Sequence, residues 1–103
     1  MPTTQYTKEA YAEANWFKAL GMMPRLAIIR ALAVGEKTVA ELAALVGIGY
    51  PSANSAVVVL ERAGLIYTEV AGNSRRCRLV NAVVKKDSVE LTSPGGARVV
   101  LPL

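Results

Sequence analysis

A short polar run around Asn54 has residue types and a spacing that can bind nucleic acid. The run consists of Tyr50, Ser52, Asn54 and Ser55. An asparagine can pair with N6 and N7 of adenine in the major groove, and a serine can bond to a base edge or to a phosphate. Plainer roles also fit, because Ser52 can cap a helix, Asn54 can be a solvated turn residue and Tyr50 can pack against the turn. We predict DNA contacts at these four residues and leave the plainer roles open.

Three arginines, Arg75, Arg76 and Arg78, supply the positive charge that such contacts require. The chain contains 12 Lys and Arg against 8 Asp and Glu, which gives a formal net charge of +4. Residues 75–103 contain six basic and two acidic side chains, so they carry the whole excess. Basic groups that displace counterions from duplex phosphates supply most non-specific affinity, so we predict that these arginines grip phosphate or enter the minor groove. A solvated hairpin kept soluble by its arginines is the alternative.

Other chemistry has little support in the sequence. Glu9 and Glu13 lie four residues apart on one helical face, but Lys8 is nearby and the chain has no histidine to act as a base or a ligand. No glycine-rich phosphate loop, metal-ligand spacing or nucleophile beside a base is present. We therefore expect no enzyme, no metal site and no cofactor.

The single cysteine, Cys77, stands between two of the arginines. Cysteine is commonly buried, and Leu79 shares its face of a strand at period two, so we predict that Cys77 faces the core. If it were exposed, its arginine neighbours would lower the pKa of the thiol, so its reactivity stays open. One cysteine cannot form an internal disulfide, which is consistent with a reducing cytoplasm.

A helix-turn-helix is the element that would hold the polar run. Thr38 can cap the helix that it begins, and Glu41 three residues later completes a capping box. Gly47 is typical of a helix end with positive φ, and Pro51 suits the first turn of the next helix. So short a helix before so tight a turn makes the two helices cross steeply and presents the second helix, residues 51–62, outward. The apolar stripe of the first helix is predicted to consist of Leu42, Leu45 and Val46.

Two hairpins are predicted after the helices. Strands at 65–70 and 76–80 flank residues 71–75, whose Gly-Asn-Ser sequence tolerates the positive φ of a tight connection. Residues 89–92 and 97–101 are β-prone and flank the turn signal Ser-Pro-Gly-Gly. The first hairpin, which carries the arginines, would be a basic wing beside the second motif helix.

Several short pieces occur in a fixed order over most of the chain. They are Phe17-Lys18-Ala19-Leu20-Gly21, Arg25-Leu26 with Ile28-Ile29, Gly35-Glu36, Val39 with Glu41-Leu42-Ala43, Leu60 with Ala63-Gly64-Leu65, and Gly72 before Leu79. In this order they resemble the ArsR/SmtB-like winged-helix repressors of bacteria and archaea. The resemblance implies a homodimeric, operator-binding transcriptional repressor.

The chain departs from that family in two places. Thr38 and Ala40 stand where metal-sensing members carry cysteines, and the histidines of the other common metal site are missing, so a metal sensor of either familiar type is not expected. Family members usually end in a helix that helps to pair the subunits, whereas residues 81–103 favour a hairpin.

The N-terminal helix is the other candidate for pairing the subunits. Its predicted apolar stripe consists of Ala10, Ala14, Phe17 and Leu20, with Tyr11 and Trp16 off the stripe. Extra aromatic surface favours a partner helix, although a tight core within one chain explains it as well. We expect a homodimer formed through this helix and the C-terminal hairpin.

These observations predict one domain over residues 1–103, mainly α with a small β part (α+β). The fold is a winged helix-turn-helix with an N-terminal helix at 7–21, a helical core at 24–64, a wing at 65–80 and a β-rich tail at 81–103. An extra C-terminal β-hairpin is expected within that tail.

The predicted function is sequence-specific binding of double-stranded DNA by a homodimeric transcriptional regulator, a repressor that is not a metal sensor. The alternative is a winged helix that binds another protein through its apolar helix and the C-terminal hairpin. No membrane-spanning run or leader segment is recognised, so we expect a cytoplasmic protein associated with the nucleoid.

Overall fold

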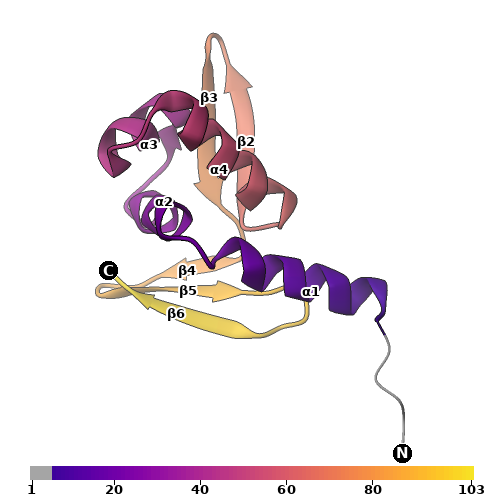
Figure 1. Cartoon of the computed structure of the whole chain (residues 1–103). Coiled ribbons are helices and arrows are strands. Elements are labelled where there is room, and N and C mark those ends of the chain that lie inside the picture. The colour runs from indigo at the N-terminus through magenta and orange to yellow at the C-terminus, as the bar shows by residue number, and fades with distance from the viewer. Residues whose placement is uncertain (1–5) are drawn as a thin grey trace, which may run out of the picture.

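The computed structural model describes residues 6–103 and has the predicted α+β architecture (Figure 1). Residues 1–5, which the predicted domain includes, lie outside the described residues. The elements are α1 (Lys8–Ala19), α2 (Met23–Ala33), β1 (Lys37–Thr38), α3 (Val39–Val46), α4 (Tyr50–Arg62), β2 (Ile66–Ala71), β3 (Ser74–Leu79), β4 (Ala82–Val84), β5 (Ser88–Thr92) and β6 (Arg98–Pro102). The winged helix-turn-helix with an additional C-terminal hairpin is thus confirmed.

The helix-turn-helix consists of α3 and α4, whose axes are bent by 112°. Thr38 Oγ1 accepts a hydrogen bond from the Glu41 backbone N–H at 3.1 Å, and Glu41 Oε1 accepts one from the Thr38 N–H at 2.9 Å, so the predicted capping box is present. Gly47 ends α3 with φ 78°, a conformation that favours glycine. Pro51 lies in the first turn of α4, as predicted.

Strands β2 and β3 form the wing, an antiparallel hairpin that β1 extends to three strands in the order β1-β3-β2. Ala71 pairs with Ser74, so Gly72 and Asn73 form a two-residue turn, and Gly72 has φ 62°. Figure 1 shows this hairpin projecting away from α1 and the C-terminal strands. The strands extend closer to the turn than the sequence predicted, because only two residues are needed for the connection.

The tail forms a second antiparallel sheet of three strands, in the order β4-β5-β6. The hairpin of β5 and β6 was predicted, whereas β4 was not. Ala82 pairs with Leu91 and Leu91 with Val99, so the inner face of this sheet continues across all three strands. The Arg30 Nε–H donates to the Pro102 carbonyl at 2.9 Å and joins the last strand to α2.

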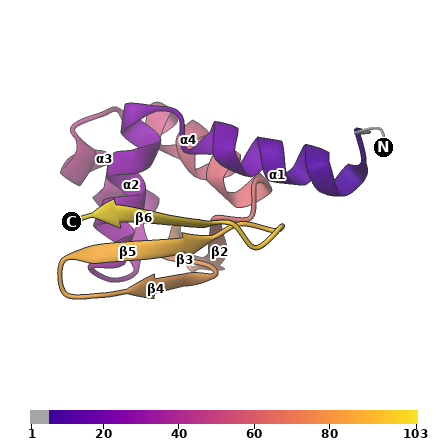
Figure 2. The same cartoon turned by 90° about the horizontal axis from the view of Figure 1, so that it is seen from below.

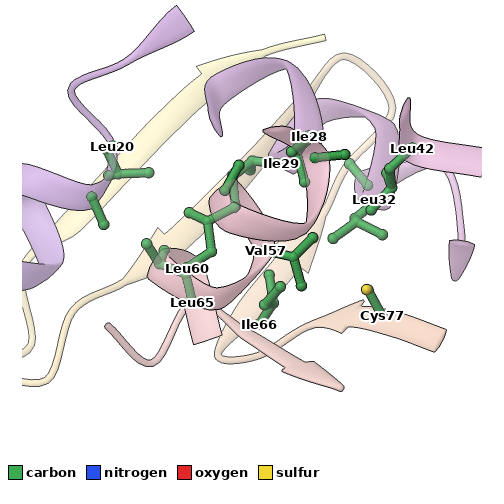
Figure 3. Packing of buried hydrophobic residues seen from close by; sticks show 14 of the residues in the cluster. Leu20, Ile28, Ile29, Leu32, Leu42, Val57, Leu60, Leu65, Ile66 and Cys77 are labelled. Atoms are coloured by element: carbon green, nitrogen blue, oxygen red, sulfur yellow. The ribbon is translucent and has the colours of Figure 1, made fainter. Parts of the chain in front are cut away.

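The core lies between the helices and both sheets (Figure 3). Helix α2 contributes Ile28 and Ile29, helix α4 contributes Val57 and Leu60, and Cys77 of β3 is fully buried, as predicted. The second sheet adds Val89 and Leu91, both fully buried. The tail therefore belongs to the same core cluster as the helices.

The predicted stripes of α1 and α3 are wrong at several positions. In α1, Trp16 is only 1% exposed, whereas Ala10 and Ala14 are exposed and Phe17 is 44% exposed. The buried side of α1 runs through Trp16, Ala19 and Leu20.

In α3, Leu45 is 62% exposed, and the buried residues are Val39, Leu42 and Ala43. Both errors have one cause, since helical period alone does not say which side meets a distant partner.

Helix α1 runs past the turn between β5 and β6, at one end of the second sheet (Figures 1 and 2). Glu13 Oε1 accepts a hydrogen bond from the Gly95 backbone N–H at 3.0 Å, at the turn between β5 and β6. Glu13, which the sequence offered as half of an acidic pair, therefore has a structural contact. Within residues 6–103, no single helix is long and apolar enough to span a membrane, and only the bent pair α3 and α4 reaches that length together.

Candidate nucleic-acid interface

The outer face of α4 carries most of the predicted polar run. Tyr50, Ser52 and Ser55 are exposed, whereas Asn54 is half-buried. The opposite face is packed in the core through Ala53, Ala56, Val57 and Leu60. Burial of one face fixes the orientation of the helix, so the two serines and the tyrosine are held toward solvent.

The N-terminus of α4 differs from that of α3. Gly49 is the N-cap residue of α4, and among residues 6–103 no side chain caps the first backbone N–H groups. Ser52 is therefore not the helix cap, and this plainer interpretation of the serine is wrong, because the helix begins two residues before it. Uncapped backbone N–H groups at a helix N-terminus can bind a phosphate oxygen.

A groove of about 510 Å³ lies beside this face, between α4 and the start of α2. Its lining residues are Met22, Pro24, Arg25, Ile48, Pro51, Ser52, Ser55, Ala56 and Val59. Two of the candidate residues, Ser52 and Ser55, thus lie at the edge of a hollow with mainly apolar walls.

Successive side chains of β3 point to opposite faces of the strand, so the three arginines of the wing do not all share one face. Arg75 lies on the face of Cys77 and is half-buried, whereas Arg76 and Arg78 lie on the other face and are exposed. The guanidinium of Arg78 stacks over the ring of Tyr67, 4.7 Å from its centroid. The outer face of the wing therefore carries two accessible positive charges.

Arg75 joins the wing to α4 by bonding to two side chains of that helix and to one side chain of the wing. Its Nη2 forms a salt bridge with Glu61 Oε1 at 2.8 Å, and its Nη1 donates to Asn54 Oδ1 at 3.2 Å. Its Nε donates to Thr68 Oγ1 at 3.3 Å, and the Thr68 hydroxyl in turn donates to Glu61 Oε2. We call these four residues (Asn54, Glu61, Thr68 and Arg75) the arginine clasp.

The structure thus brings together two of the predicted site residues, Asn54 and Arg75, in a contact with each other. It separates Arg75 from Arg76 and Arg78. The roles of Glu61 and Thr68 were missed by the sequence reasoning. The parity that predicted a buried Cys77 also puts Arg75 on the inward face two residues earlier, so the signal for an inward arginine was present.

Burial raises the pKa of the Cys77 thiol, with Arg75 lowering it and Glu61 raising it to smaller extents. Its Sγ contacts the Arg75 carbonyl oxygen at 4.0 Å. A thiol that is both buried and held protonated is a poor nucleophile, because the thiolate is the reactive form. Cys77 therefore acts as a small apolar residue of the core.

Two of the three basic residues of the tail are paired, unlike the outer arginines of the wing. Lys85 Nζ lies 3.3 Å from Glu90 Oε2, and Arg98 Nε lies 3.6 Å from Glu90 Oε1. In the part of the chain that the structure describes, Arg76 and Arg78 form no salt bridge, and no cluster of three or more His, Cys, Asp or Glu could hold a metal ion.

Comparison with known proteins finds a family profile and several structures. The profile of the MarR family matches residues 23–76, from α2 into β3. The transcriptional repressor BigR from Xylella fastidiosa is similar with 33% identity and a TM-score of 0.62, over 71% of this chain and 74% of that one. Among curated protein sequences, none matches the chain.

Two further structures extend the likeness. The winged helix-turn-helix domain Mb0332 from Mycobacterium bovis, described as homodimeric, DNA-binding and possibly of the ArsR family, has 27% identity and a TM-score of 0.66 over 76% of this chain and 75% of its own. A transcriptional regulator of the ArsR family has 30% identity and a TM-score of 0.66 over 77% of this chain and 78% of its own.

Proposed function

The chain belongs to the MarR family, and on that premise we propose that it is a homodimeric transcriptional regulator that binds double-stranded DNA. The observation that carries the proposal is the outward presentation of α4, with its exposed polar face, beside a wing with two exposed arginines. BigR and Mb0332, whose names describe a transcriptional repressor and a DNA-binding domain, support the same function.

In this proposal, α4 enters the major groove with Tyr50, Ser52 and Ser55 toward the DNA. The serines are exposed and can each donate or accept a hydrogen bond at a base edge or a phosphate. The amides of the first turn have no side-chain cap, which favours a phosphate at that end. Tyr50 is exposed at the first position of the helix and packs on a sugar of the backbone.

Arg76 and Arg78 hold the wing against the phosphates. Both are exposed on the outer face of β3. A long, always charged side chain can reach a phosphate from the flank of the hairpin, and each such contact releases counterions. Arg75 differs from them, because it lies on the inner face of β3 and is paired with Glu61.

The subunits pair through α1, with the C-terminal sheet beside it. Tyr11 is 71% exposed on α1, and Phe17 is exposed on the same helix. On the second sheet, Val83 and Val100 are exposed on either side of Glu90. Apolar surface of this kind is expected at an interface between copies, and a two-fold dimer predicts a near-palindromic site with half-sites about one helical turn apart. Sedimentation of the purified protein measures the pairing directly.

The regulator acts as a repressor that is neither a metal sensor nor an enzyme, and it works in the cytoplasm on the nucleoid. Occupation of an operator by a dimer excludes other proteins from that duplex. BigR, described as a repressor, supports this direction of control.

Titration of random-sequence duplex DNA over a salt series tests the proposal. The slope of log K against log salt falls by about two units in Arg76→Ala/Arg78→Ala, because about one unit is lost for each phosphate contact. Lys85→Ala/Arg98→Ala is the matched control, since it removes the same two charges from residues already paired with Glu90, and it leaves the slope unchanged. If the wild type binds no duplex below roughly micromolar concentration at low salt, DNA binding is refuted and a protein partner takes its place.

A further inference from the structure

We propose that Arg75 is a positioning residue for sequence-specific binding: the arginine clasp holds the wing and the Asn54 amide in one arrangement, and Arg75 itself binds no phosphate. This inference rests on the proposed DNA-binding function. It assigns the three arginines of the wing two different roles, which depend on the face of β3 that each occupies.

The hydrogen bonds of Arg75 are directed into the protein. Its Nε, Nη1 and Nη2 each donate to a different side chain, namely Thr68, Asn54 and Glu61. A guanidinium is planar and has five N–H donors in fixed directions, so three bonds to three partners determine its orientation. Two N–H groups remain, but the guanidinium cannot turn toward a phosphate without breaking these bonds.

The charge of Arg75 is also balanced locally. Glu61 lies 2.8 Å from Nη2, and the side chains of Arg75 and Glu61 are 26% and 35% exposed. An ion pair that is partly withdrawn from water contributes little net field at the surface, so it adds little to the attraction of a phosphate chain. The outward-facing Arg76 and Arg78 retain that role.

The clasp orients the amide of Asn54. Its Oδ1 accepts from Arg75 Nη1 at 3.2 Å, which identifies the oxygen and therefore the nitrogen of the side chain. Asn54 makes no other side-chain hydrogen bond within residues 6–103, so Nδ2 keeps both donors for a base acceptor, such as N7 of a purine or O4 of thymine. An amide held in one orientation costs less conformational entropy on binding than a mobile one.

The clasp also restrains the outer half of the wing. Arg75 pairs with Val70, one residue pair from the turn, and Thr68 lies on the other strand. Val70, Ala71, Gly72, Asn73 and Ser74 are all exposed, so the hairpin has no core at its end. Bonds from Arg75 and Thr68 to α4 therefore fix the angle between the wing and the helix. Simultaneous contact of α4 with the major groove and of the wing with the phosphates depends on this angle.

The test compares a preferred duplex, selected by the wild-type protein from a random library, with random duplex. Arg75→Lys keeps the charge but cannot form the three-way bonding, so the ratio of specific to random affinity falls about 10-fold while the salt slope on random duplex is unchanged. Arg98→Lys in the tail is the matched control. It keeps the ratio, because Arg98 is paired with Glu90 and lies outside the proposed DNA interface.

A second variant leaves Arg75 itself unchanged. Thr68→Val preserves the β-branched shape and removes the hydroxyl that bonds to Glu61 and Arg75, so the ratio falls by a few-fold. In the DNA-free protein, amide hydrogen exchange over residues 69–76 becomes faster in both clasp variants, whereas exchange in β4–β6 does not. A global loss of folding in Arg75→Lys would accelerate both regions, and Thr68→Val then decides alone.

The inference is overturned if Arg75→Lys keeps the affinity ratio and Arg75→Ala lowers the salt slope by about one unit, as expected for a phosphate ligand. Unchanged affinity ratio and wing exchange in Thr68→Val would overturn it as well. Both results leave the proposed function intact. Failure of the wild type to bind any duplex is a different outcome, which removes the function and this inference together.

Discussion

The wing and the C-terminal sheet are both antiparallel, but they differ in how their strands are buried. In β5, buried and half-buried residues alternate over the full length, and Val89 and Leu91 are inaccessible. In the wing, only Ile66 in β2 and Cys77 in β3 are buried, and the residues near the turn are exposed. The second sheet is therefore part of the core, whereas the wing contributes to the core only near its base.

This difference shows why the wing needs polar contacts that the second sheet does not need. A hairpin of two strands is marginal in water unless something packs against it. At the base of the wing β1 and the core provide that support. Farther out, the arginine clasp is the contact with α4.

The two regions also use their basic residues differently, although residues 75–103, which lie within them, contain the whole positive excess of the chain. In the tail, Lys85 and Arg98 share one carboxylate, Glu90, while Lys86 is exposed and forms no salt bridge within residues 6–103. In the wing, one arginine is paired with Glu61 and two are exposed. The number of basic residues in a segment therefore does not give the number of phosphate ligands, because pairing within the protein decides which charges remain available.

Leu91→Ala is expected to have the largest effect on stability. It tests whether the second sheet is part of the core. Removal of a fully buried leucine costs about 2–5 kcal/mol of unfolding free energy, through lost burial and the cavity that remains. Thermal or urea unfolding measures the loss. Val100→Ala on the outer face of the same sheet is the control, and its cost should be within about 0.5 kcal/mol, because Val100 is exposed. Equal effects of the two variants would mean that the tail is not part of the core.

Thr38→Ala tests the base of the wing with a smaller effect. Thr38 caps α3 and, within β1, pairs with Arg76 of the wing. Loss of an N-cap hydroxyl costs about 1 kcal/mol. Ser52→Ala in α4 is the matched control and costs less than about 0.5 kcal/mol, since that serine caps nothing and is exposed. Urea unfolding compares them, and an equal loss in both variants would contradict the difference between the two helix ends.

The fold was largely predictable because its signals are local. The cap at Thr38, the helix end at Gly47 and the turn at Gly72 each depend on a few neighbouring residues. The side of α1 that is buried was not predictable in the same way. It depends on where the other elements of the core lie, and Trp16 rather than Phe17 is buried among them.

The candidate site was less predictable for the same physical reason. The exposure of Ser52 and Ser55 follows from one helix, so sequence spacing was enough. The contact of Arg75 with Glu61 joins residues from a strand and a helix, and nothing in the composition indicates it. Alternation along β3 did indicate the inward face of Arg75, but its partners there became clear only from the tertiary structure.

The smallest expected effect is on the unfolding free energy at acid pH. It comes from Glu41 at the base of the wing and not from the acids of the tail. The Thr38 backbone hydrogen bond is the main factor that lowers the pKa of Glu41; the Thr38 hydroxyl adds to it, and Lys37 and Arg76 contribute less. A folded pKa below the unfolded value near 4.5 means that the ionised carboxylate stabilises the fold above about pH 4.5. That contribution is lost as the pH falls through the lower folded pKa.

Glu41→Gln isolates this term, because glutamine can also complete a capping box but does not titrate. Between about pH 5 and pH 3, the wild type should lose slightly more unfolding free energy than the variant, as measured by urea unfolding at each pH. The acids of the tail are common to both proteins and cancel in the difference. Parallel curves would mean that Glu41 is not ionised preferentially in the folded state. A difference between the two proteins that is confined to acid pH would instead assign part of the acid sensitivity to the capping box of Thr38 and Glu41, where α3 meets the base of the wing.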